Sequence, residues 1–306
     1  MNTRISDPAA RRPPRTAECA VVVVSYQSAR QLPRLLSDLG AAQVRQVLVV
    51  DNCSTDDSRA LAEAAGVEVL STGANLGYAG ALNLAWRTIP GDLPVLVLNP
   101  DLTMGPGAVR ALLAAVHEQH AGVAVPMIVG PGGVLARSLR REPSVLRAFA
   151  TALLGRRAGA LSELVWSDAA YAGTAHVDWA CGAALLITAE CRRVVGEWDD
   201  ARFFLYSEET DYLRRVRDAG FGVVYTPDAV VTHEGGGSGG DGELVALMAV
   251  NRVRYFEKHH GPAAARWFRA AVALHELLRS ADPAHRAALR AVLHRPSWPD
   301  LPGGRA

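Results

Sequence analysis

Over its first hundred residues the chain alternates short apolar runs with segments of helical periodicity. The apolar runs lie at 20–24, 47–50, 67–70 and 95–98. Helical patterns follow the first three, near 31–40, 56–65 and 79–88. Short buried strands separated by helices are typical of a parallel sheet covered by helices on both faces. The pattern predicts an α/β fold, with Ser54 and Asp57 as a capping signal for the second helix.

The pattern becomes looser after residue 101. Strand-like runs recur at 122–125, 183–187 and 222–231, with a helix near 209–219. A glycine-rich run at 235–240 predicts a flexible break, and helical patterns follow near 243–259, 264–280 and 284–294. We predict a disordered tail (1–18), one α/β domain with a first half (19–105) and a second half (106–240), and a C-terminal helical segment (241–306).

Composition excludes several classes of protein. The 306 residues carry 32 basic and 31 acidic side chains, so no global charge indicates nucleic acid as a partner. Lys258 is the sole lysine, which excludes a Walker phosphate loop. The four cysteines show no metal-type pairing, and no apolar run is long enough to span a bilayer. These features predict a cytoplasmic protein with reduced thiols.

Polar residues follow three of the predicted strands, where ligands of open α/β sheets bind. They are Ser25-Tyr26-Gln27, the run from Asp51 to Asp56, and Asn99-Pro100-Asp101. Asp51 can accept a hydrogen bond from a pyrimidine N–H, or it can cap the next helix, and the sequence leaves both open. The segment NLGYAGALN (75–83) opens a helix, and small residues at Gly77 and Gly80 would let a phosphate approach the backbone. An ordinary strand-to-helix turn explains it equally well.

Asp101 is a candidate metal ligand, because carboxylate oxygens suit Mg²⁺ or Mn²⁺ and can link the ion to a diphosphate. His233 follows the last predicted strand directly and is the candidate second ligand, with a structural histidine as the alternative.

The run Glu208-Glu209-Thr210-Asp211 places three carboxylates at a predicted helix start. Acidic residues favour a helix N-terminus for dipole reasons alone. Crowded, partly buried carboxylates also raise one another's pKa, which suits a general base. Upstream, Trp179 and Gly182 form a candidate platform for a sugar, with a core tryptophan as the alternative.

Six segments in order resemble the inverting family 2 glycosyltransferases with the GT-A fold, in particular the bacterial rhamnosyltransferase-like branch. The resemblance covers about residues 19–240. Its segments are VVVVSYQSARQLPRLLSDL, VLVVDNCSTDDS, NLGYAGALNLA, VLVLNPD, WACGAALLI and FFLYSEETDYLRRVRDAGFGVVYTPDAVVTHEGGGS.

The resemblance implies that residues 19–105 form the nucleotide-sugar-binding half and residues 106–240 the acceptor-binding and catalytic half of one GT-A domain. It also implies a role for each candidate residue. Asn99 and Asp101 match the D-x-D-type metal motif, with Asn at its first position, and His233 matches a residue that can join the cation. Trp179 and Gly182 match the acceptor side, where we also place Asp211. The expected nucleotide-binding residues are Ser25, Tyr26, Asp51, Asn52, Ser54, Asn75, Gly77 and Gly80.

The sequence departs from the family at Glu209, where the family usually has Asp as the base. A glutamate is one methylene longer, so Glu209 is the expected base and Glu208 the alternative. The implied reaction moves a sugar from a UDP- or dTDP-activated donor, with dTDP-rhamnose as one candidate, to an acceptor hydroxyl with inversion. A non-catalytic nucleotide-sugar-binding protein and a sugar nucleotidyltransferase are the alternatives.

The acceptor's nature is open: a saccharide, a lipid-linked saccharide or a small molecule. Residues 137–157 hold six arginines against Glu142, interleaved with apolar residues, and Val145, Phe149 and Leu153 would share one helical stripe. With the basic, aromatic segment after Arg252, this region predicts either a homodimer or sheet-covering surface, or peripheral contact with the inner face of the plasma membrane. Reversal of Arg140, Arg141 and Arg147 to Glu is expected to abolish such membrane contact.

Overall fold

The computed structural model describes residues 17–235 and 242–303. The fold is built on a central sheet in which the strand order is β3-β2-β1-β4-β10-β6-β11-β5. β8 pairs with β11 outside this order. The strands of this sheet are β1 (Ala17–Ser25), β2 (Val44–Asp51), β3 (Glu68–Ser71), β4 (Val95–Leu98), β5 (Leu102–Met104), β6 (Ala121–Val129), β8 (Ala175–His176), β10 (Ala184–Ile187) and β11 (Gly222–His233). β7 (Leu139–Arg140) and β9 (Trp179–Ala180) form a separate small sheet.

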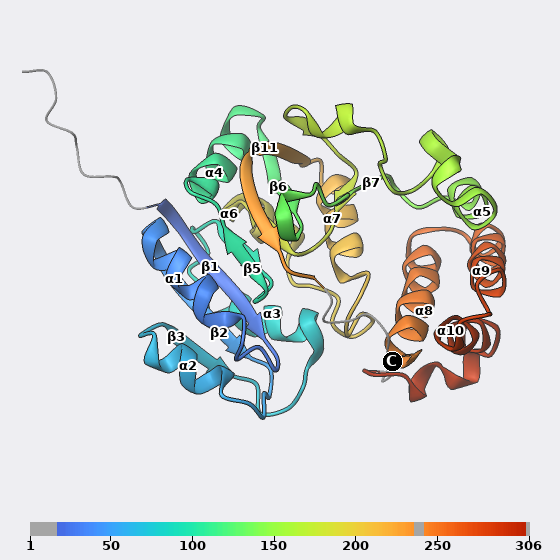
Figure 1. Ribbon diagram of the computed structural model, residues 1–306, viewed down its shortest axis with the longest axis horizontal. Coiled ribbons are helices and arrows are strands. Elements are labelled where there is room, and N and C mark those ends of the chain that lie inside the picture. Colours follow the sequence, from blue (N-terminus) through green and yellow to red (C-terminus); the bar gives the residue numbers. More distant parts are fainter. Residues whose placement is uncertain (1–16, 236–241, 304–306) are drawn as a thin grey trace, which may run out of the picture.

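Helices cover both faces of the sheet, as Figure 1 shows. The α-helices of the described residues, including those that lie beside the sheet, are α1 (Leu32–Ala42), α2 (Ser58–Ala64), α3 (Gly77–Thr88), α4 (Ala108–Glu118), α5 (Val145–Leu154), α6 (Ala189–Val195), α7 (Glu208–Asp218), α8 (Gly242–His259), α9 (Pro262–Leu277) and α10 (Pro283–Leu293). Short 3₁₀ segments are η1 (Pro131–Gly133), η2 (Gly155–Leu161), η3 (Asp168–Tyr171) and η4 (Arg295–Asp300).

Alternate residues of each strand supply two cores. On one face Val22, Val97 and Leu185 pack under α3 and α7. On the other face Val23, Leu96 and Leu186 pack under α1 and α4. Successive strand side chains point to opposite faces, so a continuous apolar run is what a strand buried on both sides requires. The predicted mostly parallel sheet between helices is confirmed.

Two features of the sheet differ from the simple βαβ pattern. β10 runs antiparallel to both β4 and β6. β5, which the sequence did not reveal, follows β4 after a connection of three residues and pairs antiparallel with the end of β11. A three-residue strand has too few positions for a readable alternation. Its pairing nevertheless decides where Asp101 meets His233.

The predicted termini and caps need correction. Ala17 and Glu18 belong to β1, and not to a tail, while residues 1–16 lie outside the described residues. Ser54 does not cap α2; its Oγ accepts from the Gln27 N–H, and the Ser58 N–H is bound by Asp56. Most of the predicted glycine-rich break, 236–240, also lies outside the described residues.

The three C-terminal helices lie beside the sheet rather than on it, at the right of Figure 1, and α5 joins them. Their shared core contains Ala148 of α5, Val250 and Phe256 of α8, Phe268 of α9 and Val292 of α10. The predicted stripe on α5 is only partly inward. Val145 and Phe149 pack against this core, whereas Leu153 is 62% exposed.

Three arginines expected on this surface, Arg140, Arg141 and Arg147, are half-buried instead. Arg141 donates to the carbonyl of Ser162, and Arg147 donates to that of Glu142. Exchanging these arginines for Glu would disturb local packing, so the exchange would not be a clean test of membrane contact.

Candidate functional site

The ends of β1 and β2 form one side of the site. Ser25 pairs with Asp51 in the parallel register, and both side chains are buried. Asp51 Oδ1 lies 3.4 Å from the Ser54 N–H, so the carboxylate helps to hold the turn after β2. The Ser25 hydroxyl is buried and has no hydrogen-bond partner among the described residues. An unpaired polar group at a strand end is a candidate ligand contact.

The loops after these strands are tied to each other. Gln27 donates from its backbone to Ser54 Oγ at 3.1 Å and from its side chain to Thr55 at 2.8 Å. Tyr26 precedes Gln27 and is 51% exposed. An exposed aromatic ring on a held loop, beside Asp51, is a suitable surface for a planar base.

Asn52 holds the segment before α3 against β2. Its amide donates to Asn75 Oδ1 at 2.8 Å and to the Gly77 carbonyl at 3.3 Å, and its oxygen accepts from the Leu76 N–H at 2.9 Å. The sequence suggested that a glycine at position 77 lets a phosphate approach the backbone, and the structure shows a packing reason for this glycine. A Cβ there would lie 2.2 Å from the Phe204 carbonyl oxygen, and φ is +74°. Gly77 therefore serves contact with the 203–206 loop.

Gly80 also lies in a tight position, since a Cβ there would lie 2.9 Å from Leu76 Cβ, in the turn before its own helix. The neighbouring Tyr78 donates its N–H to the Phe204 carbonyl at 2.7 Å. The Tyr78 hydroxyl is buried without a partner among the described residues. Burial, together with the charges of Glu208 and Glu209, raises the pKa of Tyr78 well above its ordinary value. The sequence did not single out Tyr78, although it lies within the quoted NLGYAG segment.

Asp101 and His233 meet at the turn between β4 and β5. The pairing of Leu102 with His233 brings them together. His233 Nε2 lies 3.1 Å and 3.0 Å from the two Asp101 carboxylate oxygens, and the Glu234 N–H donates to the Asp101 carbonyl. Asn99 is held through its N–H by the Ala183 carbonyl.

This pair fits a divalent cation that takes its remaining ligands from elsewhere. A carboxylate and an imidazole nitrogen converge on one point, and such a mixed set suits Mn²⁺ or Mg²⁺ with additional oxygen ligands. In the described part of the chain no third Asp, Glu, His or Cys completes a cluster. A bound diphosphate and water would have to supply the other ligands.

Glu208 and Glu209 begin α7, which opposes the small β7–β9 sheet. The two residues before them, Tyr206 and Ser207, have positive φ values of 68° and 70°. Such backbone strain in non-glycine residues persists only where the surroundings hold it. Here Asn251 of α8 donates to the carbonyls of Leu205 and Tyr206, at 2.8 Å and 3.2 Å.

Both glutamates have raised pKa values. Burial raises the pKa of Glu208 well above its ordinary value, and the neighbouring Glu209 charge adds to the effect. Burial also raises the pKa of Glu209, while backbone N–H groups and the Arg140 charge oppose the shift. Gly182 provides the space beside it, since a Cβ at that position would lie 3.0 Å from Glu209 Cβ. A carboxylate with a raised pKa is a better proton acceptor near neutral pH.

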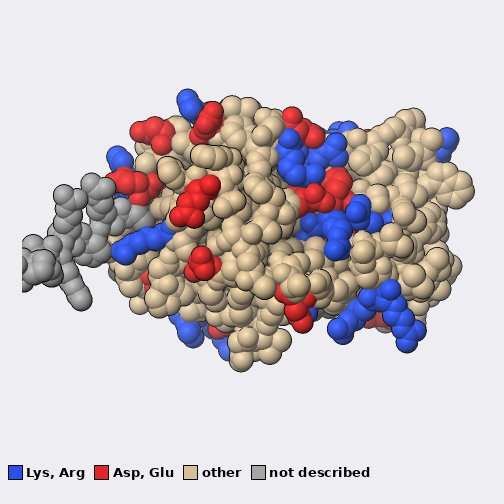
Figure 2. Space-filling view, turned by 90° about the horizontal axis from the view of Figure 1, so that it is seen from above, with Lys and Arg blue, Asp and Glu red and all other residues tan. Residues whose placement is uncertain are grey.

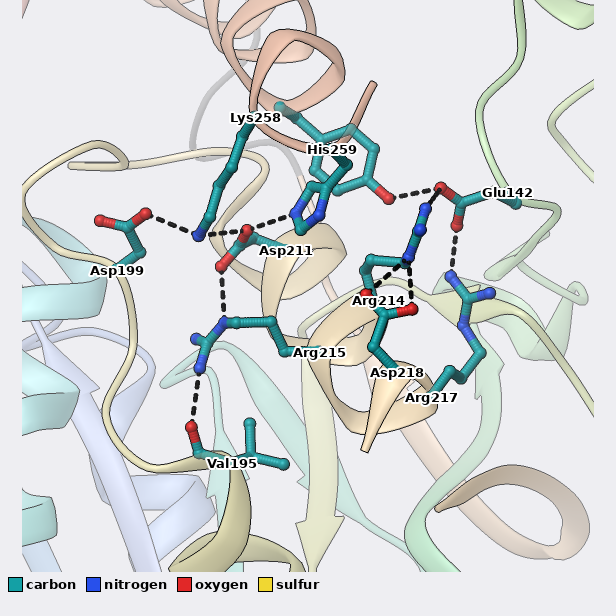
Figure 3. A network of polar contacts seen from close by, with 11 residues as sticks. Glu142, Val195, Asp199, Asp211, Arg214, Arg215, Arg217, Asp218, Lys258 and His259 are labelled. Atoms are coloured by element: carbon teal, nitrogen blue, oxygen red, sulfur yellow. Dashed lines mark hydrogen bonds and ion pairs between the residues drawn. The ribbon is translucent and has the colours of Figure 1, made fainter. Parts of the chain in front are cut away.

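Asp211 lies one turn further along α7 and has the opposite environment. Its carboxylate is fully buried, within 2.6 Å of Lys258 Nζ, 2.8 Å of His259 Nε2 and 2.9 Å of Arg215 Nε. Figure 3 shows these groups around it. Although burial opposes ionisation, these partners lower the pKa of Asp211 to about 2. The predicted contact with an acceptor does not fit a side chain enclosed in this way.

A cavity of about 240 Å³ lies beside Glu209, between the small sheet and the C-terminal helices. Trp179 lines it and donates its indole N–H to the Arg141 carbonyl at 3.0 Å. The other lining residues are Arg140, Pro143, Cys181, Glu163, Tyr206, Ser207, Thr210, Met248, Arg252, Tyr255 and Phe268. The structure thus brings Trp179, Gly182 and Glu209 close together. The contributions of α8 and α9 carry no sequence signal of their own.

Comparison with known proteins identifies the family. Residues 20–166 match the model described as Glycosyl transferase family 2. The chain is 34% identical over 273 residues to an N-acetylglucosaminyl-diphospho-decaprenol L-rhamnosyltransferase of Mycobacterium tuberculosis, a match that covers 82% of this chain and 86% of the relative. It is 26% identical over 204 residues to the low-salt glycan biosynthesis hexosyltransferase Agl10 of Haloferax volcanii, covering 65% and 62%.

Solved structures share the fold. GalNAc-T7, solved with UDP, GalNAc and Mn²⁺, superposes with a TM-score of 0.59 at 14% identity over 78% of this chain and 47% of that one. Residues 1–349 of S. aureus TarS, in complex with UDP-GlcNAc, give a TM-score of 0.52 at 15% identity over 92% of both chains. The predicted GT-A fold is confirmed, and the chain belongs to glycosyl transferase family 2 as a rhamnosyltransferase-like enzyme.

Proposed function

We propose that the protein transfers a sugar from a UDP- or dTDP-activated donor, with dTDP-L-rhamnose as the first candidate, to a hydroxyl of a lipid-linked saccharide, with inversion. The observation that carries this proposal is the cavity beside Glu209, which is lined by Trp179 and Arg140 and which would hold the acceptor. The M. tuberculosis relative, whose printed name specifies L-rhamnose and a diphospho-decaprenol acceptor, supports the choice of substrates.

The donor nucleotide lies along the ends of β1 and β2 in this proposal. Tyr26 stacks on the base, Asp51 or the Ser54 turn contacts it, and the Ser25 hydroxyl has a free donor toward the ligand. Asn52, Asn75, Gly77 and Gly80 hold the loop that closes this edge. Asp101 and His233 would hold a divalent cation, which when bound supplies positive charge to the leaving diphosphate.

Glu209 acts as the general base. It takes the proton of the acceptor hydroxyl while that oxygen attacks the anomeric carbon, and the bond to the diphosphate oxygen breaks on the opposite side. One displacement inverts the anomeric centre, and no covalent enzyme intermediate forms. Glu208, whose Oε2 is buried and unpartnered in the described structure and whose pKa is raised by burial, is the alternative acceptor of the proton.

Peripheral membrane contact remains part of the proposal. No helix within the described ranges is long and apolar enough to cross a bilayer. Leu146, Leu153 and Leu154 of α5 are exposed, and so is Trp267 of α9. Figure 2 shows a largely uncharged surface toward the end of the molecule where these helices lie. Sedimentation with anionic liposomes tests the contact, and self-association without lipid would favour the homodimer alternative.

The enzyme assay uses the full chain with a panel of dTDP- and UDP-sugars and a lipid-linked N-acetylglucosamine diphosphate. Transfer with Mn²⁺, its loss with EDTA and an inverted product linkage by NMR are the expected results. Asp101→Ala is expected to abolish transfer nearly completely with little loss of thermal stability, because the carboxylate lies at a strand end and His233 is its side-chain partner among the described residues. Asp92→Ala, an exposed carboxylate before β4, is the matched control. An active Asp101→Ala enzyme would contradict the metal assignment.

A further inference from the structure

Two arginines from distant parts of the chain line the cavity beside Glu209. Arg140 belongs to β7 and Arg252 belongs to α8. The proposed reaction requires only a base and room for the acceptor sugar, so it leaves both cations without a task. Partly buried guanidinium groups are expensive to leave unpaired, which makes their partners informative.

Arg140 is held in place but is not neutralised. Its Nη1 donates to the carbonyls of Arg137 and Leu139, at 2.7 Å and 3.1 Å. Its guanidinium carbon lies 5.8 Å from the centroid of the Trp179 ring. Within the described residues no carboxylate forms a salt bridge with it, and its hydrogen bonds all come from Nη1. Because a guanidinium carries five N–H donors, Nε and Nη2 remain for a ligand.

Arg252 is paired but still accessible to the cavity. Its Nη2 lies 3.1 Å from Glu163 Oε2, and both residues line the cavity. The two arginines and Glu163 together leave one positive charge at the cavity wall, close enough to Glu209 for the Arg140 charge to act on it. A planar guanidinium with free donors in a partly dry site matches a phosphate group well.

The rest of the cavity indicates what else the ligand carries. Pro143, Met248 and Phe268 supply an apolar wall. Directly after Pro143 the chain enters α5, whose Leu146 is 63% exposed. An acceptor that has a hydroxyl, an anionic group and an apolar chain in this order would meet complementary chemistry at each step.

We infer that Arg140, assisted by Arg252, binds the diphosphate of a lipid-linked acceptor and so makes that diphosphate a requirement for efficient transfer. The inference rests on the proposed function, because it assumes that the acceptor sugar lies at Glu209. It assigns Arg140 as a specificity-determining residue, which neither the metal site nor the base explains.

The experiment compares two acceptors that have the same sugar and the same alkyl chain. One carries a diphosphate between them, and the other is the neutral alkyl glycoside. The wild-type enzyme is expected to prefer the diphosphate acceptor by about 10- to 100-fold in kcat/KM, the range for charge-assisted hydrogen bonds. The sugar-free alkyl diphosphate is expected to compete with the acceptor, whereas the alkyl alcohol is not.

Arg140→Gln is expected to bring the ratio of the two kcat/KM values toward one, mainly through KM for the diphosphate acceptor. Arg140→Lys keeps the charge but not the planar fork, and should restore part of the preference. Arg137→Gln is the matched control, because Arg137 lies outside the cavity lining and pairs with Asp168. It should retain the wild-type ratio.

The outcomes separate the inference from the proposed function. Equal use of both acceptors by the wild-type enzyme, or an unchanged preference in a folded Arg140→Gln variant, overturns the inference and leaves glycosyl transfer intact. If Arg140→Gln does not fold, the competition by alkyl diphosphate decides, and its absence overturns the inference. Transfer to neither acceptor with any donor overturns the proposed function as well.

Discussion

Two acidic sites on α7 lie one turn apart and have opposite electrostatics. Glu209 lines the cavity and Glu208 is buried beside it. Neither has an ion-pair partner among the described residues, and burial raises the pKa values of both. Asp211 is enclosed by Lys258, His259 and Arg215, and its pKa falls to about 2. Acidic residues on one helix therefore have two roles: at 208 and 209 they can accept a proton, and at 211 the carboxylate joins α7 to α8 by ion pairs. The partners supplied by other elements make the difference.

The network around Asp211 connects α7 to its surroundings. Lys258 also lies 2.7 Å from Asp199, in the loop that leads to α7. On the other side of the helix Glu142 pairs with Arg214 and Arg217 and accepts a hydrogen bond from Tyr255, as Figure 3 shows in part. Through these contacts α8 stabilises the position of α7 and of the loop that precedes it, and so the position of Glu209.

The largest expected effect is on catalysis. Glu209→Gln is expected to lower kcat by about 10²- to 10⁴-fold, the contribution of a general base. Donor affinity and the unfolding temperature should change little, because a neutral amide suits this buried position. Steady-state kinetics and donor titration measure both. If Glu208→Gln is the crippling change and Glu209→Gln is mild, the base is Glu208.

Asp211→Asn is expected to lower the free energy of unfolding by about 3 kcal/mol, since it leaves buried cations without their counter-charge. Urea unfolding of both proteins measures the change. Asp218→Asn is the matched control, because that carboxylate pairs with Arg214 at a half-exposed position and should change stability by less than about 0.5 kcal/mol. If Asp211→Asn lowers the free energy of unfolding by less than about 1 kcal/mol, the ion pairs of Asp211 do not stabilise the contact between α7 and α8 as proposed.

The smallest effect is the pH dependence of stability, in which the two sites have opposite signs. The lowered pKa of Asp211 means stabilisation that is full above its ordinary pKa of 3.8 and is lost as the pH falls toward about 2, roughly 2.4 kcal/mol in all. The raised pKa of Glu208 means a loss of stability as the pH rises above 4.5. Acidification from pH 8 to 5 should therefore stabilise the wild type relative to Glu208→Gln. Parallel urea titrations at each pH check the sign.

Local sequence was sufficient for the parts of the site that follow strands. Apolar runs predicted β1, β2 and β4, and the polar residues that follow them were therefore expected at one edge of the sheet. The helix at 208–218 and its acidic first turn were equally readable from periodicity. The reasons behind individual residues were less accessible. Gly77 and the Ser54 turn have packing partners, Phe204 and Gln27, that lie 127 and 27 residues away.

What the sequence determined by itself is the α/β framework and the chemistry at its strand ends, because period and burial are encoded within a few consecutive residues. Only the tertiary structure decided that β5 brings Asp101 to His233. It also decided that Lys258 and His259 of α8 pair with Asp211, while Glu209 has no ion-pair partner among the described residues. A carboxylate's pKa depends on the dielectric and the charges within a few ångströms. Those neighbours come from segments far away in the chain, so no local pattern could reveal them.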